Sequence, residues 1–333
     1  MRNDPLKKIL AGVSAVAVLV LVLLPLIGHQ YAMIWIFFLS VSLTLALSYD
    51  IVGGYLGYMN LGHSTSFGLG AYATAISLNQ GLNLAPALIV AAAVAALFAA
   101  AVGYPLFRLR GAYFALATFG LISLVEVVTN NLRDLTGGSG GISTPPGDHT
   151  ISSYYMALAV TIGTMLISYR VARSRFGLAL FSIREHEEVA RAFGVPTARY
   201  KWLALIISSV PAGLIGGVYV WNIGYISPPS VFGLEIALAP IVMALLGGTG
   251  IMVGPFIGAV FITFVQEMIW TEVPYFHLTM YGTVLVLLGL FMPGGLVRTR
   301  WIRPLMERLG LGEEISYLAE PSPATRKDQD APA

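Results

Sequence analysis

Long apolar runs separated by short polar segments dominate the pattern along this chain. A transmembrane helix needs about 20 mostly apolar residues, and ten runs reach or approach that length: 9–28, 31–52, 64–78, 86–107, 113–131, 153–171, 200–221, 234–246, 251–271 and 277–297. Two of them, 64–78 and 234–246, are short enough to be half-spanning or re-entrant. The pattern predicts an all-α, polytopic bundle of about ten membrane segments, of which two are short.

Composition narrows the class of protein further. The chain has 333 residues, of which 56% are hydrophobic and 11% are charged, against roughly 25% charged in an average soluble domain. So few charges cannot cover the surface of a water-soluble protein, and a coiled coil or a disordered chain is excluded as well. Without cysteine, the chain has no disulfide framework and no thiolate metal site.

The positions of the basic residues predict the orientation. If the N-terminus is cytoplasmic and all ten segments cross, every one of the 19 Lys and Arg residues except Arg133 lies on the cytoplasmic side. Both termini are then cytoplasmic. Residues 1–8 form a short N-terminal segment, residues 9–303 a single transmembrane domain with a cytoplasmic loop at 172–200, and residues 304–333 a disordered polar tail.

The chain lacks the signatures of an enzyme. None of its lysines, Lys7, Lys8, Lys201 and Lys327, follows a glycine, so no Walker A motif is present. No H-E-x-x-H or G-x-S-x-G pattern occurs, and the five histidines are scattered. We therefore expect no catalytic residue, no metal and no cofactor.

Acidic residues touch the predicted spans only near their ends. They are Asp50, Glu126, Glu235 and Glu267. Proton pathways use ionisable groups inside the membrane, and none lies clearly at the midplane here. This disfavours a proton-coupled transporter.

A glycine-rich break precedes the short segment 64–78. Gly62, Ser66 and Gly70 recur every four residues, which places small side chains on one helix face. Such a face serves either close helix packing or a substrate path. Ser64 is a suitable N-cap, and the helix start carries a partial positive charge that suits a carboxylate. The candidate path residues are Asn60, Gly62, His63, Ser64, Ser66 and Gly70.

A second glycine-rich segment lies in an outer loop. Gly137, Gly138, Ser139 and Gly141 precede Pro145-Pro146, so that a flexible stretch adjoins a rigid corner. The loop is either a contact or gate for an extracytoplasmic partner, or a connector.

The cytoplasmic loop contains a predicted amphipathic helix that ends at Gly194, with Pro196 just beyond. Ile183, His186, Ala190 and Phe193 share one face of it. The helix is either solvated or a docking element for a cytosolic partner.

Several motifs resemble those of a known family. Glu188-Val189-Ala190, followed after three residues by Gly194, resembles the Glu-Ala-Ala-x3-Gly loop of ABC importer permeases, with Val189 in place of an alanine. The segments 57–72 and 110–118 are similar to elements of LivM-type branched-chain amino acid permeases of the LivH/LivM family. Further similar segments are 136–141, 174–185, 246–250 and 254–259, so the resemblance extends from about residue 50 to 295.

The resemblance implies a half-pore in a bacterial-type inner membrane and no enzymatic activity of the chain itself. It implies three kinds of protein partner besides membrane lipid, and no nucleic acid: a second, LivH-type permease, two cytosolic ABC ATPase subunits and an extracytoplasmic amino-acid-binding protein. The implied ATPase-docking residues are Arg184, Glu185, Glu188, Ala190, Phe193 and Gly194. The family moves leucine, isoleucine and valine, and similar permeases move other amino acids, urea or short amides.

Two other classes stay open on the residues alone. A secondary transporter could use a sodium site made of backbone carbonyls, which leaves no trace in a sequence. A membrane-embedded enzyme or channel is disfavoured because no catalytic constellation is present.

Overall fold

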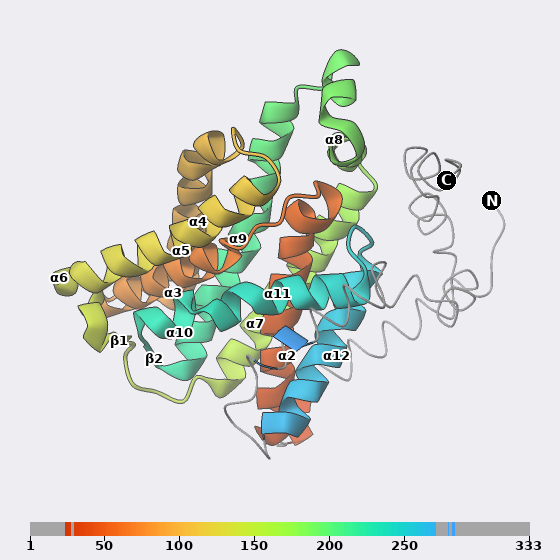
Figure 1. The fold of residues 1–333 in the computed structure, drawn as a ribbon. Coiled ribbons are helices and arrows are strands. Elements are labelled where there is room, and N and C mark those ends of the chain that lie inside the picture. The colour runs from red at the N-terminus through yellow and green to blue at the C-terminus, as the bar shows by residue number, and fades with distance from the viewer. Residues whose placement is uncertain (1–23, 28–29, 271–278, 280–281, 284–333) are drawn as a thin grey trace.

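The computed structural model describes residues 24–27, 30–270, 279 and 282–283. Helices make up most of this part of the chain (Figure 1). In order they are η1 (Leu24–Ile27), α2 (Gln30–Asp50), the π-helix η2 (Ile51–Tyr55), α3 (His63–Asn79), α4 (Leu84–Leu106), α5 (Ala112–Asn131), α6 (Arg133–Thr136), η3 (Gly138–Gly140), α7 (Thr150–Ala172), α8 (Arg175–Ala192), α9 (Thr197–Ile223), α10 (Pro228–Phe232), α11 (Leu234–Gly247) and α12 (Val253–Trp270).

Six helical stretches in the described residues are long and apolar enough to cross a membrane. They are Gln30–Tyr55, Leu84–Leu106, Ala112–Asn131, Thr150–Ala172, Thr197–Ile223 and Pro228–Gly247. Val253–Glu267 is a shorter apolar helix. The chain is therefore a multi-pass helical membrane protein. Most of the predicted first segment, 9–28, and nearly all of the last, 277–297, lie outside the described residues, as do the terminal segments 1–8 and 304–333.

The short helix α3 lies at the centre of the packing, between α4 and α9. Its glycines make this possible: a Cβ added at Gly70 would collide with the backbone of Gly213 in α9. In the same way, a Cβ added at Gly216 would collide with the Phe67 carbonyl. Small residues let helix backbones approach closely where side chains would hold them apart. The spacing of four at Gly70 thus serves close packing against α9.

The chain turns back into the bundle between η2 and α3. His63, the first residue of α3, contacts Ser48 of α2, with its Nε2 2.8 Å from the Ser48 hydroxyl. Ser48 lies about two helical turns before the end of η2. The loop 56–62 therefore descends into the helical layer, and α3 starts within it, which explains why the apolar run at 64–78 is short.

A small antiparallel sheet lies at one end of the bundle, which we call the sheet end. β1 (Ile142–Ser143) pairs with β2 (Tyr225–Ile226), with Ile142 opposite Ile226. Next to it, the Thr144 amide donates to the Gly224 carbonyl at 2.9 Å. Apart from these two strands of two residues each, the secondary structure of the described residues is helical, as predicted.

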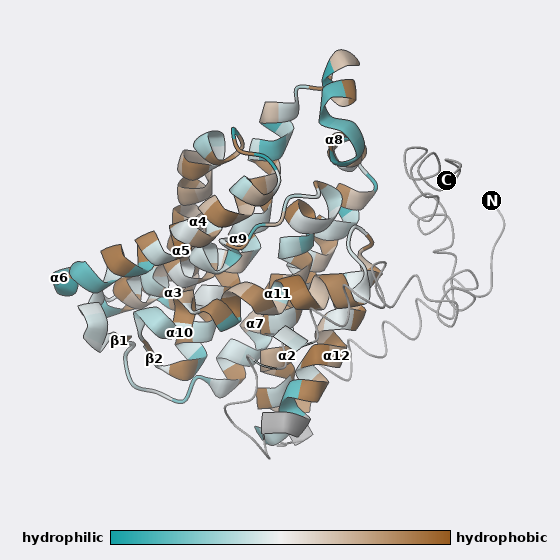
Figure 2. Cartoon of the chain, in the orientation of Figure 1, coloured by the Kyte–Doolittle hydropathy of each residue, from teal (hydrophilic) through white to brown (hydrophobic). Residues whose placement is uncertain are grey.

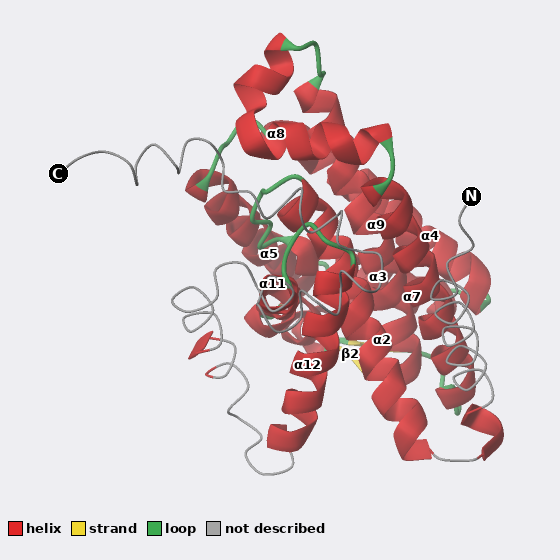
Figure 3. Cartoon of the chain, turned by 90° about the vertical axis from the view of Figure 1, so that its right-hand side faces the viewer, coloured by secondary structure: helices red, strands yellow, loops and turns green. Residues whose placement is uncertain are grey.

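Helix α8 lies across the other end of the bundle, which we call the α8 end (Figures 1 and 3). Its surface is far more hydrophilic than that of α11 or α12 (Figure 2). Ser174 caps it, accepting a hydrogen bond from the Gly177 amide at 3.1 Å. The helix is interrupted at His186, whose φ of −152° and ψ of 96° are extended rather than helical.

Candidate coupling site at the α8 end

Helix α8 rests on the bundle through an apolar face. Leu180, Ile183 and Ala190 are buried, and they pack in one cluster with residues of η2 and α9. Phe181 adds a ring contact with Tyr55, their centroids 5.1 Å apart. The face turned away from the bundle is free of these contacts, so α8 is held on one side and open on the other.

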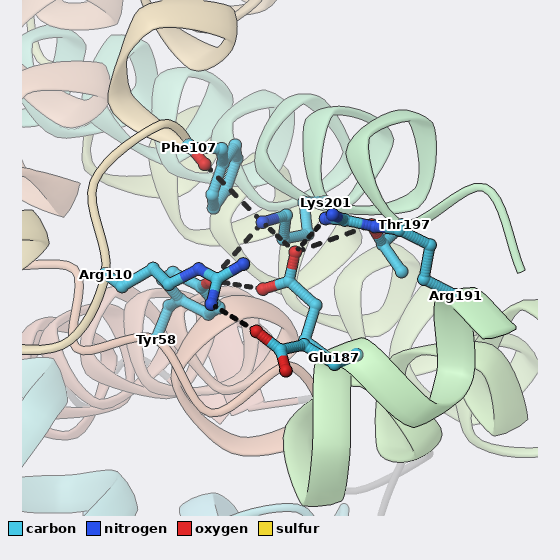
Figure 4. A network of polar contacts seen from close by, with 8 residues as sticks. Tyr58, Phe107, Arg110, Glu187, Arg191, Thr197 and Lys201 are labelled. Atoms are coloured by element: carbon cyan, nitrogen blue, oxygen red, sulfur yellow. Dashed lines mark hydrogen bonds and ion pairs between the residues drawn. The ribbon is translucent and has the colours of Figure 1, made fainter.

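A buried ion pair holds the second half of α8. Glu187 accepts a hydrogen bond from the Lys201 ammonium in α9 at 2.9 Å, and the two side chains are 12% and 4% exposed. The same carboxylate accepts from Arg191 at 3.0 Å and from the Tyr58 hydroxyl at 3.0 Å (Figure 4). Thr197 lies at its edge, 3.4 Å away. Glu187 is thus the point at which α8, α9 and the loop 56–62 meet.

Aromatic rings surround the ammonium of Lys201. It lies 5.2 Å from the ring centroid of Tyr58 and 5.6 Å from that of Phe107, and Phe114 stacks on Phe107. Ring faces attract cations, and the attraction is stronger where water is excluded. The rings therefore stabilise a charge at the start of the membrane helix α9.

The contacts around Glu187 change the pKa values of its own carboxyl group and of the Tyr58 hydroxyl. Burial alone would raise the pKa of the Glu187 carboxyl, but the hydrogen bond and the charge of Lys201 outweigh it and lower that pKa. Burial, together with the hydrogen bond to Glu187, raises the pKa of the Tyr58 hydroxyl to about 12. At neutral pH the cluster is an ionised carboxylate between a cation and a neutral phenol.

A second ion pair near α8 is open to water. Arg110 lies 3.2 Å from Glu188, and both side chains are more than half exposed. The Glu188 hydrogen bond raises the pKa of the Arg110 guanidinium. Exposed pairs of this kind add little to stability, so the pair orients the loop after α4 more than it fastens α8.

The predicted docking residues divide into two groups. Glu185, Glu188, Phe193 and Gly194 are exposed, and Phe193 is 85% exposed. Ala190 is buried, and Arg184 turns toward the bundle, donating to the Gly54 carbonyl at 2.6 Å. Gly194 has φ +85°, a left-handed conformation that suits glycine at the end of a helix.

Two expectations about this loop differ from the structure. His186 does not share the buried face of Ile183, because the backbone leaves the helix at that residue and the side chain is exposed. Lys201, one of the basic residues assigned to the cytoplasmic side, is not a free surface cation: it lies inside α9 and is 3% exposed. The role of Glu187 was missed too. A lone lysine at the start of an apolar run needs a counter-ion, and that signal could have pointed to an acid nearby.

The predicted path residues are all at or near the start of α3. Asn60, His63, Ser64 and Ser66 are buried. A Cβ added at Gly62 would lie 2.8 Å from the Thr118 carbonyl of α5, whereas Gly70 faces α9. The structure thus brings the polar members together around the loop 56–62 and places Gly70 in a different contact.

Some buried hydroxyls on α3 have no hydrogen-bond partner among the described residues. They are those of Ser64, Thr65, Tyr72 and Thr74. Buried polar groups are nearly always paired with protein or water. Among the described helices, α3 carries the most of these buried hydroxyls.

The predicted outer loop is ordered by its own backbone. Gly137, Gly138 and Gly141 all have positive φ, and the Gly138 amide donates to the Thr136 hydroxyl at 3.2 Å. Ser139 is exposed. The glycines therefore shape a defined turn leading into β1.

Comparison with known proteins agrees with this architecture. Residues 31–289 match the family model described as the branched-chain amino acid transport system / permease component. The chain belongs to this family. It is accordingly a transport permease of the ABC importer type.

Curated relatives of this permease cover most of the chain. It is 27% identical over 290 residues to the high-affinity branched-chain amino acid transport system permease protein LivM of Escherichia coli (strain K12), covering 77% of this chain and 68% of that protein. It is also 27% identical over 278 residues to the autoinducer 2 import system permease protein LsrC of Enterobacter sp. (strain 638), covering 79% and 80%. No solved structure matches the chain.

Proposed function

We propose that this permease forms half of the translocation pore of an ABC importer for branched-chain or related hydrophobic amino acids, driven by ATP hydrolysis in partner subunits. The observation that carries the proposal is α8: a hydrophilic helix fixed to the bundle by the Glu187–Lys201 pair, with an apolar residue, Phe193, exposed at its end. The α8 end faces the cytoplasm.

The proposed docking surface is the open side of α8 and the residues that follow it. Val189, in the charged second half of α8, is 51% exposed, and Phe193, directly after the helix, is 85% exposed. Large apolar side chains ringed by charges are typical anchors of protein interfaces. Glu185, Glu188 and Gly194 complete the surface, while Arg184 and Ala190 support it from the bundle side.

The assembly follows from the family and from the pattern of basic residues. The chain crosses the bacterial inner membrane about ten times with both ends in the cytoplasm, as one transmembrane domain. It pairs with a second, LivH-type permease, two cytosolic ATPase subunits and an extracytoplasmic binding protein. The exposed turn at Gly137–Gly141 at the sheet end contacts that binding protein.

The substrate path passes the start of α3. Asn60, His63, Ser64 and Ser66 offer donors and acceptors without fixed charge, and the unpaired hydroxyl of Ser64 is among them. Gly62 packs directly against Thr118, where an added Cβ would lie 2.8 Å from the carbonyl oxygen, so only glycine fits at this point of the path. Weak polar contacts suit a pore, because tight binding would slow release.

A second substrate class is supported by the relatives. LsrC of Enterobacter covers as much of this chain as LivM does, and it is a permease of an autoinducer 2 import system. Uptake of labelled leucine and of autoinducer 2 by the same reconstituted complex separates the two substrates.

The test of the proposal is a pair of substitutions at opposite ends. Phe193→Glu should abolish substrate-stimulated ATP hydrolysis and uptake while the permease still inserts, because a charge replaces the apolar anchor. Leu132→Glu, at an apolar side chain near the sheet end that is 49% exposed, should leave ATP hydrolysis intact. Normal substrate-stimulated ATP hydrolysis in Phe193→Glu would contradict the proposed docking surface.

A further inference from the structure

A second set of contacts joins α8 to the bundle, on the other side of the His186 kink from Glu187. The Arg184 guanidinium donates to the Gly54 carbonyl in η2 at 2.6 Å. The side chain of Arg184 also covers Gly57, where an added Cβ would lie 2.8 Å from its Cγ. Arg184 is half-buried, so its charge is directed into the protein although α8 offers open solvent on its other side.

The same π-helix is tied to a distant turn of the chain. Asp50, directly before η2, is fully buried, and its two carboxylate oxygens accept from the Gly250 amide at 2.9 and 3.2 Å. Gly250 lies in the turn between α11 and α12. Both oxygens of this buried carboxyl group thus have the same backbone partner, and a buried polar group is costly to leave unpaired, so the turn is fixed to the end of α2.

The three segments meet without spare room. A Cβ added at Gly250 would lie 2.8 Å from Arg184 Nη1 and 3.3 Å from the Gly54 carbonyl. A Cβ added at Gly54 would collide with both Asp50 and the Gly250 amide. Close packing transmits displacement instead of absorbing it. A shift of α8 that keeps the Arg184 bond must therefore move η2 and the α11–α12 turn with it.

We infer that Arg184 is a positioning residue for transport, which carries movement of α8 to the α11–α12 turn through Gly54 and Gly250. The inference rests on the proposed function, because ATP-driven movement of α8 is the motion that Arg184 transmits. The π-helix is suited to this step, since π-turns break the regular helical hydrogen-bond pattern and occur often at functional sites. Asp50 keeps the turn in register with η2 while α8 moves.

The chain itself supplies a clean background for the test. It contains no cysteine, so Thr249→Cys, beside Gly250, introduces a single reactive thiol into the permease. The rate at which a maleimide labels this thiol, in the complex with its ATPase and binding protein in liposomes, reports the accessibility of the turn. ATP hydrolysis is measured on the same samples.

The expected result has three parts. In the Thr249→Cys protein, adding ATP changes the labelling rate by about tenfold, the usual size of a coupling between sites. Arg184→Gln, which keeps a donor but removes the charge and the planar fork, reduces this change to less than about twofold when the samples are compared at equal amounts of bound ATPase. Arg175→Gln, the same exchange at an exposed arginine of α8, retains the full change.

Other results would overturn the inference. A nucleotide-dependent change of equal size in Arg184→Gln would show that another contact carries the movement, and the proposed function would stand. No change in the Thr249→Cys protein itself, with ATP being hydrolysed, would show that the turn does not move. If Arg184→Gln fails to assemble, Arg184→Lys gives the same test, since its shorter reach loses the Gly54 bond but keeps the charge. If no ATPase associates with the permease, both the proposed function and this inference are contradicted.

Discussion

The two ends of this permease are held together by different kinds of interaction. All three ion pairs found among the described residues involve α8, and one of them, Glu187–Lys201, is buried. At the sheet end, β1 and β2 pair through their backbones and the Gly137–Gly141 turn relies on positive φ angles. Side-chain charge fixes one end, whereas backbone conformation fixes the other.

This difference predicts where each end is vulnerable. A buried charge that loses its partner is costly, but an exposed one is not. A backbone turn tolerates the loss of most side chains and fails where a glycine is replaced at positive φ. We therefore expect the α8 end to be sensitive to loss of a buried charge, and the sheet end to be sensitive to replacement of a glycine at positive φ.

The largest effect is expected from Lys201→Met. It leaves the Glu187 carboxylate buried without its nearest cation, and removal of one member of a buried pair costs about 3–5 kcal/mol. We expect about 3 kcal/mol, the lower limit, because Arg191 and Tyr58 still contact the carboxylate. The measurement is the free energy of unfolding in detergent, with proteolysis of the loop 172–200 as a local readout.

A double substitution sharpens this result. Lys201→Met combined with Glu187→Leu removes both charges and should recover most of the loss, since an apolar pair can replace a buried ion pair. If the double variant is less stable than Lys201→Met alone, the pair is not the element that fixes α8.

A smaller effect is expected at the sheet end from Gly141→Ala. Gly141 has φ +73°, and an added Cβ would meet the Ile226 carbonyl and the Tyr225 ring. Strain of this kind costs about 1–3 kcal/mol. The matched control is Gly140→Ala, next in the chain, where an added Cβ meets nothing within 4 Å. Equal thermal stability of the two variants would contradict the backbone account of this end.

Acid should loosen the α8 end. The Glu187 pKa is lowered in the folded protein, so its contribution to stability is complete above the unfolded value of about 4.3. It is lost as pH falls through the lower, folded value. Protease sensitivity of the loop 172–200 should therefore rise on acidification below about pH 4, and Glu187→Gln should remove that part of the pH dependence. An identical acid profile in Glu187→Gln would contradict the role of this carboxylate.

The smallest effect is expected from Glu188→Gln. It breaks the exposed pair with Arg110, and water screens that interaction almost completely. Thermal unfolding should be unchanged within error, in contrast to Lys201→Met. A loss of stability comparable to that of Lys201→Met would show that exposure does not decide the strength of these pairs.

The sequence allowed the class, the family and the position of α8 to be predicted, because apolar runs and glycine spacing are local signals. The two short segments were also recognised, and α3 and α11 have 17 and 14 residues. The strands β1 and β2 could not be foreseen, since each has two residues and they pair across more than 80 positions. Glu187–Lys201 and Asp50–Gly250 were missed for the same reason: such pairings depend on tertiary packing.

The kink at His186 also escaped prediction. The residues around it fit a continuous amphipathic helix, and no proline or glycine marks the break. The side chains on its two sides have different tertiary partners: Arg184 is bound to η2 and Glu187 to α9. A sequence pattern cannot show that two neighbouring side chains have different anchors.

The most direct test of the central claim, that α8 docks an ATPase, is site-specific photo-crosslinking from Phe193 in intact cells. A photoreactive residue at Phe193 should capture a cytosolic subunit that carries a Walker A motif, identified by mass spectrometry. The same residue at Phe264, which is exposed on α12, should not. Capture of the ATPase from Phe264 and not from Phe193 would contradict the account.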